Sequence, residues 1–523
     1  MLSVLYSAGL SGIDGYTVTV ECNSGNQVPS IEIVGLPDAA VMEARDRIKT
    51  ACANSGYTFP AAELTVNLAP ASRRKEGTGL DLSILLAILR CAGYIDANVP
   101  LNKCCFVGEL SLSGNIRGVR GVLSMCAGAK DAGFEEFYAP AENAVEAAAV
   151  DGIKVYAVRN VRELVMHLNG ISRLEPVVLP LFGSEPEAMQ YDMDFSDVKG
   201  QAFAKRAMEI AAAGGHNVLL IGPPGTGKSM LAKRLPTIMP PLTFEEAIEV
   251  TKIYSAAGAL EDGVSLMMHR PFRSPHHTMS AISLVGGGAS PKPGEISLAH
   301  NGVLFLDELP EFPTMVTDAL RQPLEDGRIT ITRASGRVTF PCSFMLVGAM
   351  NPCRCGYYGH PTHPCTCRAG DVAKYVSKVS GPLRDRMDIQ IELPSLGYDE
   401  IVSGEVGERS EVIRARVCEA RSFFRRRIYG SDAIPEVGTG REKPIFCSAQ
   451  LDPARLRKFA NASPEAEDFL RGVFDSMGLS ARGYDRIMRV ARTIADLAHS
   501  EKITVPHVAE AVQLRSLDRK YWG

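Results

Sequence analysis

The sequence predicts an α/β protein built on parallel β-sheet, with a mostly helical C-terminal part. Strand-like and helix-like runs alternate over residues 1–168 and again over residues 195–394. In the second block a short apolar run leads into a glycine-rich loop and then a helical stretch, which is the context of a phosphate-binding loop. Residues 395–523 are mostly helix-like, and residues 169–194 lack a clear period and are interpreted as a linker.

Composition excludes several classes of protein. The chain has 523 residues, of which 46% are hydrophobic, and a net charge of −4. It is therefore neither wholly disordered nor a polycation that coats nucleic acid, so any DNA contact must use a few placed arginines and lysines. No residue before Arg45 is basic, and the apolar stretch 82–95 is interrupted by Arg90 and shorter than the ~18 residues of a membrane span. We expect a soluble, cytoplasmic protein without membrane contact.

The elements of the first and last blocks follow from their periodicity. In the first block, alternating β-branched residues indicate strands and longer amphipathic runs indicate helices. The last block has helical periodicity interrupted by a loop at residues 429–444. We expect strands at 17–20, 31–34, 64–68 and 155–158, and helices at 39–55, 80–92, 122–132, 397–427, 452–477, 481–499 and 505–521.

The glycine-rich loop after the strand at 216–221 reads Gly222-Pro223-Pro224-Gly225-Thr226-Gly227-Lys228-Ser229, with a helix expected at 230–235. This is the G-x-x-x-x-G-K-[ST] pattern, in which backbone N–H groups converge on phosphate oxygens. Lys228 is expected to reach the β- and γ-phosphates of ATP, and the Ser229 hydroxyl to ligate Mg²⁺. The alternative is a chance glycine-rich turn, which the matching context disfavours.

Polar residues follow two further apolar strands. Asp307 and Glu308 end the strand at 302–306, where the first carboxylate can hold Mg²⁺ and the second can polarise the attacking water. Asn351 follows the strand at 344–349 and is a candidate for orienting that water. The alternatives are a surface acidic pair and a simple capping asparagine.

Two inserts are candidates for contact with DNA. Residues 327–340 alternate in strand fashion around Ala334-Ser335-Gly336 and predict a hairpin flanked at its tip by Arg333 and Arg337. Such a tip suits phosphate contact without base readout, and a subunit contact is the alternative. The Gly-, Pro- and His-rich segment 270–302 contains His276 and His277, for which a structural or pore-lining role is favoured over metal binding.

Four of the thirteen cysteines are clustered as Cys353-Arg-Cys355 and Cys365-Thr-Cys367. Four thiols within fifteen residues of an intracellular chain favour a Cys₄ zinc site over disulfides, although C-x-C pairs are not the usual knuckle. His360 or His363 are alternative ligands. The cysteine-containing loop either contacts DNA or has a purely structural role, and the sequence does not decide between the two.

The order of these motifs resembles the magnesium-chelatase-like branch of the AAA+ ATPases. Further matching segments are Arg270–Thr278, Gly286–Gly302, Ser380–Asp388, Leu479–Arg482 and Val490–Leu497. With Val34-Gly-Leu-Pro-Asp38 in the first block, the whole chain resembles the ComM/YifB group of competence-associated ATPases. The resemblance implies that Arg386 is an arginine finger for the neighbouring subunit. It also implies that Arg482, in a helical lid, is a second sensor that closes on nucleotide, and that residues 197–201 line the adenine pocket.

The first block resembles the proteolytic domain of Lon-type proteases. The family's catalytic serine corresponds to Gly79 and its lysine to a position near Leu123. With both members of the dyad missing, no peptidase activity is expected. A scaffold or DNA-facing collar is more plausible for this domain.

The resemblance implies a ring-forming motor, expected to be a hexamer, that hydrolyses ATP to translocate on DNA. Branch migration of single-stranded or branched DNA during homologous recombination is the implied activity, with recombination proteins as possible partners. The first alternative is a chelatase-type ATP-dependent chaperone for metal insertion. The second, an unfoldase feeding the first domain, is undermined by Gly79.

Overall fold

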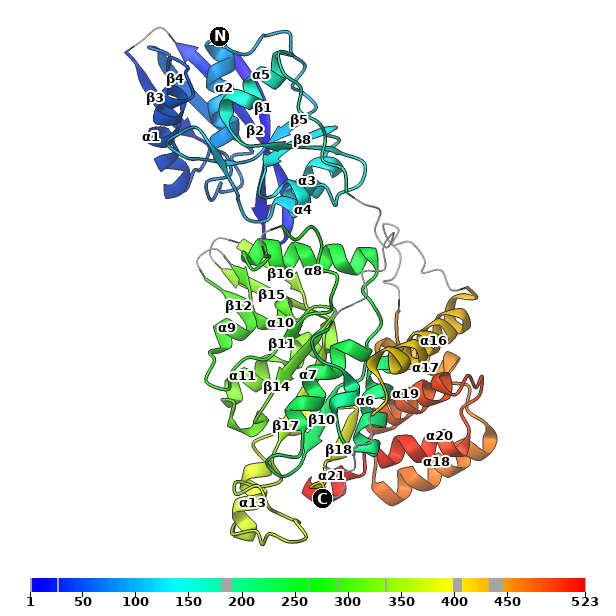
Figure 1. Cartoon of the computed structure of the whole chain (residues 1–523). Helices are drawn as coiled ribbons and strands as arrows, with labels where there is room; N and C mark the ends of the chain where they lie inside the picture. The colour runs from blue at the N-terminus through cyan, green and yellow to red at the C-terminus, as the bar shows by residue number, and fades with distance from the viewer. Residues whose placement is uncertain are drawn as a thin grey trace.

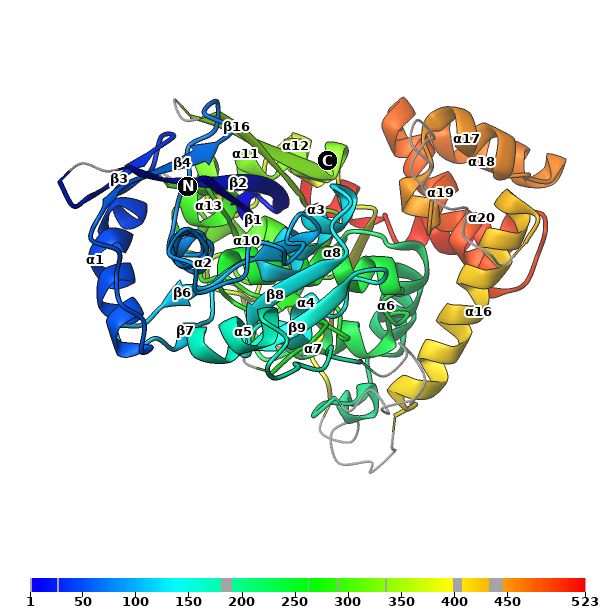
Figure 2. The same cartoon turned by 90° about the horizontal axis from the view of Figure 1, so that it is seen from above.

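The protein contains two α/β units and a C-terminal group of helices (Figures 1 and 2). The computed structural model describes residues 2–25, 28–179, 191–261, 263–288, 291–333, 336–397, 407–431 and 445–522. Residues 180–190 of the expected linker at 169–194, and most of the loop at 429–444, lie outside these ranges. No helix in the described ranges is long and apolar enough to cross a membrane.

The N-terminal unit is a seven-stranded sheet in the order β3-β4-β2-β1-β5-β8-β9. The pairs β1–β2 and β2–β4 are antiparallel, while the other neighbours are parallel, so the sheet is mixed. Its strands are β1 (Leu2–Ser11), β2 (Asp14–Gly25), β3 (Ser30–Val34), β4 (Glu63–Ala69), β5 (Cys104–Phe106), β8 (Glu136–Pro140) and β9 (Lys154–Val158).

Helices pack against this sheet, and the most apolar stretch of the chain forms one of them. Residues 82–89 of α2 are completely buried, which explains their hydrophobicity without a membrane. Asp38 caps α1 by accepting a hydrogen bond from Val41 N at 2.8 Å. The helices are α1 (Ala39–Asn54), α2 (Asp81–Cys91), α3 (Val122–Asp131), α4 (Ala144–Ala147) and α5 (Val161–Leu168), with a small ribbon of β6 (Glu109–Leu110) and β7 (Ile116–Arg117).

The second unit is a five-stranded parallel sheet in the order β11-β14-β17-β10-β18. The register places Ile221 beside Met350 and Glu392, so the carboxyl ends of β10, β17 and β18 share one edge. Side chains that follow these strands are thereby brought together. The strands are β10 (Val218–Ile221), β11 (Phe272–Arg273), β14 (Val303–Leu306), β17 (Met345–Met350) and β18 (Ile389–Glu392).

Helices and two ribbons surround this sheet. Thr243 and Glu246 form a capping box that starts α8. The helices are η1 (Phe195–Asp197), α6 (Ala202–Gly214), α7 (Lys228–Ile238), α8 (Phe244–Ala257), α9 (Ala281–Val285), α10 (Glu295–Leu298), η2 (Leu309–Glu311), α11 (Thr314–Ala319), α12 (Arg321–Asp326), α13 (Ala369–Val376) and α14 (Gly381–Arg384). The ribbons are β12 (Gly286–Gly287) with β13 (Lys292–Pro293), and β15 (Arg328–Arg333) with β16 (Gly336–Pro341).

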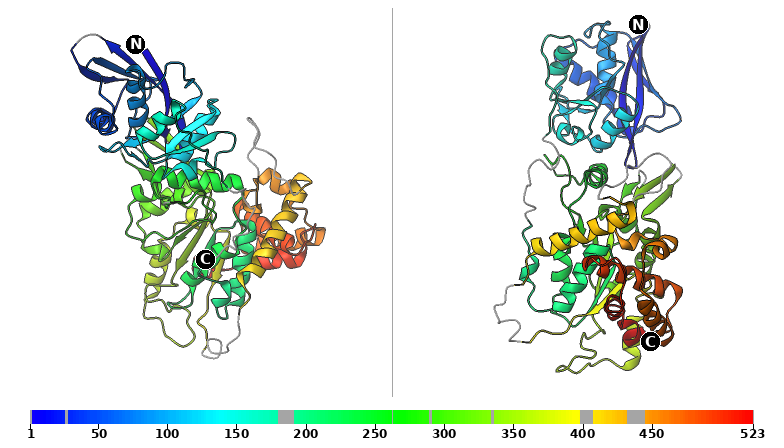
Figure 3. Two further views of the ribbon diagram at one scale, coloured as in Figure 1. Left: turned by 45° about the horizontal axis from the view of Figure 1, so that its top comes forward. Right: turned by 90° about the vertical axis from the view of Figure 1, so that its right-hand side faces the viewer.

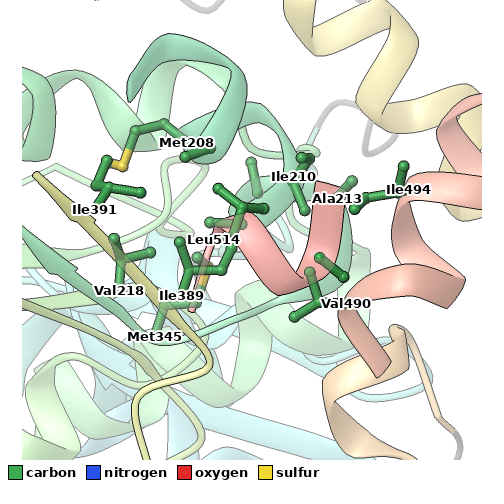
Figure 4. Close-up of a cluster of buried hydrophobic side chains, with 14 of the residues drawn as sticks. Met208, Ile210, Ala213, Val218, Met345, Ile389, Ile391, Val490, Ile494 and Leu514 are labelled. Carbon is green, nitrogen blue, oxygen red and sulfur yellow. The ribbon is translucent and has the colours of Figure 1, made fainter. Parts of the chain in front are cut away.

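The C-terminal helices pack on the sheet through α6 and α19. Figure 4 shows Ile210 and Ala213 of α6 next to Val490 and Ile494 of α19, with Leu514 over β18. The helical elements are α16 (Ser410–Tyr429), η3 (Ser448–Gln450), α17 (Pro453–Phe459), α18 (Pro464–Met477), α19 (Ala481–Leu497), α20 (Val505–Gln513) and α21 (Leu517–Trp522).

Three helix predictions in this part need correction. The expected helix 452–477 is two helices, because Asn461 is left-handed at φ 49° and Ser463 with Pro464 starts a new helix. The expected helix 505–521 is also two, since the Leu514 carbonyl accepts a hydrogen bond from Gln390 N of β18 at 2.7 Å. Within the expected helix 397–427, residues 407–409 are not helical and α16 begins at Ser410, while residues 398–406 lie outside the described ranges.

The N-terminal unit rests on α8 and on the hairpin β15–β16 (Figures 1 and 3). Gly121 N donates a hydrogen bond to Ser255 Oγ of α8 at 3.1 Å. At the β1–β2 turn, a Cβ on Gly12 would lie 2.5 Å from Val338 Cγ1 of the hairpin. One flank of the predicted pore hairpin therefore contacts the N-terminal unit, which the sequence did not indicate.

Candidate active site

The glycine-rich loop joins β10 to the start of α7, at the carboxyl edge of the central sheet. Gly225 and Gly227 have φ values of 80° and 88°, which side chains with a Cβ rarely adopt. The Lys228 ammonium folds back on the loop and donates to Gly222 O at 2.6 Å and Pro223 O at 2.8 Å. The loop is thus preformed around the amine that would meet the phosphates.

Residues from three strands converge on this loop. Asn351 Oδ1 accepts a hydrogen bond from Lys228 Nζ at 3.2 Å, because β17 ends beside β10. The Ser229 hydroxyl donates to Asp307 Oδ2 at 2.6 Å. A hydroxyl and a carboxylate so placed fit the oxygen ligands that Mg²⁺ prefers. The structure therefore brings together Lys228, Ser229, Asp307 and Asn351, which the sequence selected from separate motifs.

Burial lowers the pKa of Lys228 to about 8, and the nearby Asp307 carboxylate opposes that shift. A charged amine that is partly desolvated gains from an anionic partner. The phosphates of a nucleotide would supply that partner and favour the charged form of Lys228.

Glu308 lies at the same edge in a strained conformation. Its φ is 52°, in the left-handed region, at a cost of roughly 1–3 kcal/mol for a residue with a side chain. Its side chain is 58% exposed, and Glu308 Oε2 lies 3.3 Å from His277 Nδ1. A strained, accessible carboxylate beside the phosphate loop is suited to activate water.

His277, for which the sequence favoured a structural or pore-lining role, has a contact with Glu308 that the sequence did not indicate. It comes from the insert at 270–302, lies against His276 with ring centroids 4.1 Å apart and ring planes tilted by 33°, and meets Glu308 from a distant part of the chain. No spacing rule links residues that follow different strands, so the sequence carried no signal for this pair. A pore-lining role alone does not account for the position of His277.

The segment 197–201 reaches the same loop from outside the sheet. Gln201 Nε2 donates to Pro394 O at 2.8 Å and to Thr226 O at 3.4 Å. Asp197 pairs with Arg234 of α7 at 2.8 Å. This placement suits the role in the adenine pocket that the resemblance implies.

Arg386 lies at the opposite edge of the sheet from the loop. It precedes β18, whose residue Ile389 pairs with Val218 at the start of β10, whereas Lys228 follows the end of β10. Asn217 Nδ2 donates to Arg386 O at 2.9 Å, and the guanidinium contacts Pro382 O at 2.7 Å and the Glu325 carboxylate. Arg386 is therefore separated by the sheet from the nucleotide loop of its own chain.

Arg482 lies on the same side as Arg386. Both line a cavity of about 900 Å³ between the amino edge of the central sheet and the C-terminal helices. Arg482 is exposed in the first turn of α19, which Ser480 caps. Arg482 therefore lies on the same cavity as Arg386, away from the nucleotide loop of its own chain.

The four clustered thiols converge. The Sγ atoms of Cys353, Cys355, Cys365 and Cys367 all lie within 4.8 Å of one another. Cys353 Sγ is 3.3 Å from Cys355 Sγ and 3.6 Å from Cys365 Sγ. A tetrahedral zinc with Zn–S bonds of about 2.3 Å would hold its thiolates ~3.8 Å apart, so the set fits Zn²⁺.

The surroundings of the cluster favour the thiolate form at one of the four cysteines. Although burial opposes the change, backbone N–H groups of Tyr357 and Thr366 lower the pKa of Cys355 to about 5, whereas burial and the neighbouring thiols raise the pKa of Cys353, Cys365 and Cys367. His360 is engaged elsewhere: Nε2 contacts Ser395 Oγ at 2.8 Å, and Nδ1 accepts from His363 N at 3.0 Å. The geometry favours four cysteine ligands over a set with His360.

The hairpin β15–β16 forms as its alternation indicates, with Thr332 opposite Arg337 and Arg333 opposite Gly336. Both arginines are exposed. A Cβ on Gly287 of β12 would lie 3.3 Å from an Arg333 nitrogen, so the two inserts meet at this end. The turn residues Ala334 and Ser335 lie outside the described ranges.

The fold and site define a magnesium-chelatase-like protein of the AAA+ class. Three family profiles match: "Magnesium chelatase, subunit ChlI" over residues 194–401, "Subunit ChlI of Mg-chelatase" over 20–143, and "Magnesium chelatase, subunit ChlI C-terminal" over 407–515. Within that class, the chain belongs to the ComM/YifB family.

Relatives that match over nearly their whole length support the assignment to this family. The chain is 41% identical to the uncharacterized protein YifB of Escherichia coli and 40% identical to the competence protein ComM of Haemophilus influenzae. Each comparison covers 99% of this chain and 98% of the relative. The magnesium-chelatase 38 kDa subunit of Rhodobacter capsulatus is 24% identical over 60% of this chain and 84% of that subunit.

Proposed function

We propose that this protein is an ATP-hydrolysing ring motor that translocates on DNA and drives branch migration in homologous recombination, during natural transformation. One observation supports a motor that works as a ring: the nucleotide loop and the candidate arginine finger, Arg386, lie on opposite edges of one sheet. A site divided in this way is complete only where two subunits meet. The relationship to a protein named for competence supports DNA as the substrate.

The residues at the loop divide the work of hydrolysis among them. The backbone of residues 222–227 and the Lys228 amine bind phosphates, and Ser229 with Asp307 would hold the Mg²⁺ that neutralises their charge. Glu308 accepts a proton from the attacking water, while Asn351 orients that water. His277, whose Nδ1 lies 3.3 Å from Glu308 Oε2, helps to position the Glu308 carboxylate.

The neighbouring subunit supplies positive charge. Arg386 reaches the γ-phosphate held by the adjacent subunit and stabilises the transition state. Arg482, on the same cavity, acts on that same nucleotide rather than on its own. Hydrolysis is thereby coupled to assembly of a ring, which we propose to be a hexamer.

The remaining parts have supporting roles in this proposal. Residues 1–168 form a Lon-protease-like domain without peptidase activity, joined by the linker 169–194 to the AAA+ core at 195–394. At the dyad positions, Leu123 is buried, and Val107 and Val119 are the nearest neighbours of a Cβ built on Gly79. Residues 395–523 form the helical lid. The protein acts in the cytoplasm, and recombination proteins are its candidate partners.

We assign Zn²⁺ to the four cysteines as a structural metal. Thiolates at these distances repel one another unless a cation holds them, and a loop with little core gains its folding energy from that cation. The residues that would bind the metal are Cys353, Cys355, Cys365 and Cys367.

Arg333 and Arg337 are the proposed DNA contacts, because both are exposed and flank the turn of the hairpin. In a ring, these two arginines of every subunit together form a local concentration of positive charge, although the net charge of each chain is −4. A double Arg333→Glu, Arg337→Glu variant is expected to retain its ATPase activity without DNA and to lose stimulation by forked DNA. Loss of two phosphate contacts also flattens the salt dependence of DNA binding by about two units of slope.

The control is an Arg328→Glu variant, which changes an exposed arginine at the base of the same hairpin. Stimulation of the tip variant by DNA to the wild-type level would remove these residues from the DNA interface. A chelatase-type chaperone for metal insertion is the alternative function, favoured by the family profiles; it requires no stimulation by DNA.

A further inference from the structure

The cysteine cluster lies next to one residue of the nucleotide site, Asn351. Cys353 follows Asn351 by two residues, and its side chain is fully buried. At the other end, Cys367 leads directly into α13. Tyr375 of that helix is buried in the same hydrophobic cluster as Met350 and Cys353, the residues on either side of Asn351. Both ends of the loop therefore pack around the strand end that carries the asparagine in contact with Lys228.

The same loop also touches the phosphate-binding loop directly. Gly356, one residue after the second cysteine, has φ 88°, and a Cβ there would lie 2.7 Å from Pro224 Cδ. This approach leaves no space for a side chain. The backbone between the two cysteine pairs thus supports the proline of the loop that is to cradle phosphate.

Little besides the thiols holds this segment in place. Residues 361–364 are all exposed, and the loop contributes only Cys353 to the buried core. Its outer contacts include His360 Nε2 with Ser395 Oγ at 2.8 Å and Tyr358 with Tyr521, whose ring centroids are 6.4 Å apart. Trp522 Nε1 of the same C-terminal helix donates to Val376 O of α13 at 3.3 Å. A loop of this kind depends on a bound metal for its conformation.

We infer that the metal at Cys353, Cys355, Cys365 and Cys367 is a positioning element of the nucleotide site, which holds Asn351 and Pro224 in place for hydrolysis. The inference rests on the proposed ATPase activity and goes beyond it, because it assigns the cluster to catalysis rather than to DNA. The cysteines act through Asn351 and touch neither nucleotide nor water themselves.

The test compares full-length protein carrying zinc with the same protein after chelation, together with a Cys365→Ser variant. Metal content is measured by mass spectrometry, nucleotide affinity with a fluorescent ATP analogue, and kcat in steady state. Misplacing a catalytic group by about 1 Å costs on the order of 100-fold, so we expect kcat to fall by about 10- to 100-fold with nucleotide affinity retained. Cys418→Ser, which alters a thiol of α16 outside the cluster, is the matched control and is expected to behave as wild type.

Two further measurements separate positioning from general stability. A Cys365→His variant keeps a zinc ligand and is expected to recover both zinc and kcat. In an Asn351→Ala background, removal of the metal is expected to lower kcat no further, since the residue through which it acts is gone. A purely structural metal would instead lower kcat by the same factor in both backgrounds.

Each result decides one question. Equal zinc in wild type and Cys365→Ser would remove the metal site, and an unchanged kcat after chelation would overturn the positioning role. A zinc-loaded wild type without ATPase activity would instead contradict the proposed function itself. A fall in kcat that is restored by zinc supports the inference.

Discussion

A Glu308→Gln variant is expected to bind ATP with near wild-type affinity and to hydrolyse it at least 100-fold more slowly. The amide preserves the shape of the side chain but cannot accept the proton of the attacking water, and general-base catalysis contributes about 10²- to 10⁴-fold. The phosphate contacts come from Lys228 and the loop backbone, which this change leaves intact. Steady-state ATPase assays and binding of a fluorescent ATP analogue measure the two quantities separately.

Glu311→Gln is the matched control for this prediction. Glu311 is a second carboxylate three residues along the chain, and it pairs with Lys378 at 3.2 Å instead of with the loop. It is expected to retain wild-type hydrolysis. Comparable activity of Glu308→Gln and wild type would show that another group activates the water.

Replacing Arg386 by Ala is expected to lower kcat by about 10³-fold, the effect typical of removing an arginine finger. Because Arg386 and Lys228 lie on opposite edges of one sheet, the loss occurs at the neighbour's nucleotide. An Arg384→Ala variant, which removes a guanidinium lying 5.1 Å from the Trp522 ring centroid, is the control and should keep most activity.

Mixed rings test the shared site more sharply than either variant alone. Subunits with Lys228→Ala lack a working loop but carry Arg386, whereas subunits with Arg386→Ala carry a working loop. Mixing the two inactive proteins is expected to restore part of the ATPase activity, because some interfaces then contain both groups. If the mixture stayed as inactive as its components, Arg386 would not act on a neighbouring subunit.

Local motifs made much of the site predictable. The phosphate-binding loop Gly222–Ser229 is recognised from its own pattern together with a strand before it and a helix after it. Asp307 and Asn351 are recognised because each ends an apolar run. Parallel strands then bring the three segments to one edge without further information. The clustered cysteines are close in sequence, so their convergence could be anticipated as well.

Contacts between segments that are distant in the chain could not be predicted from the sequence. His277 meets Glu308 because β11 and β14 are parallel neighbours and the segments that follow them share one edge of the sheet. Gly356 meets Pro224 because the cysteine loop packs against the phosphate-binding loop. The position of Arg482 depends on how α19 packs against α6, which no local pattern encodes. The split between α17 and α18 was marked by Ser463-Pro464, a helix start that continuous periodicity obscured.

The most direct test of the motor function uses a synthetic four-way DNA junction with labelled arms, full-length protein and ATP. Wild-type protein is expected to convert the junction into two duplex products at a rate that depends on ATP, and Glu308→Gln to bind the junction without converting it. A wild-type protein that hydrolyses ATP at the same rate with and without the junction, and leaves it intact, would contradict a DNA motor.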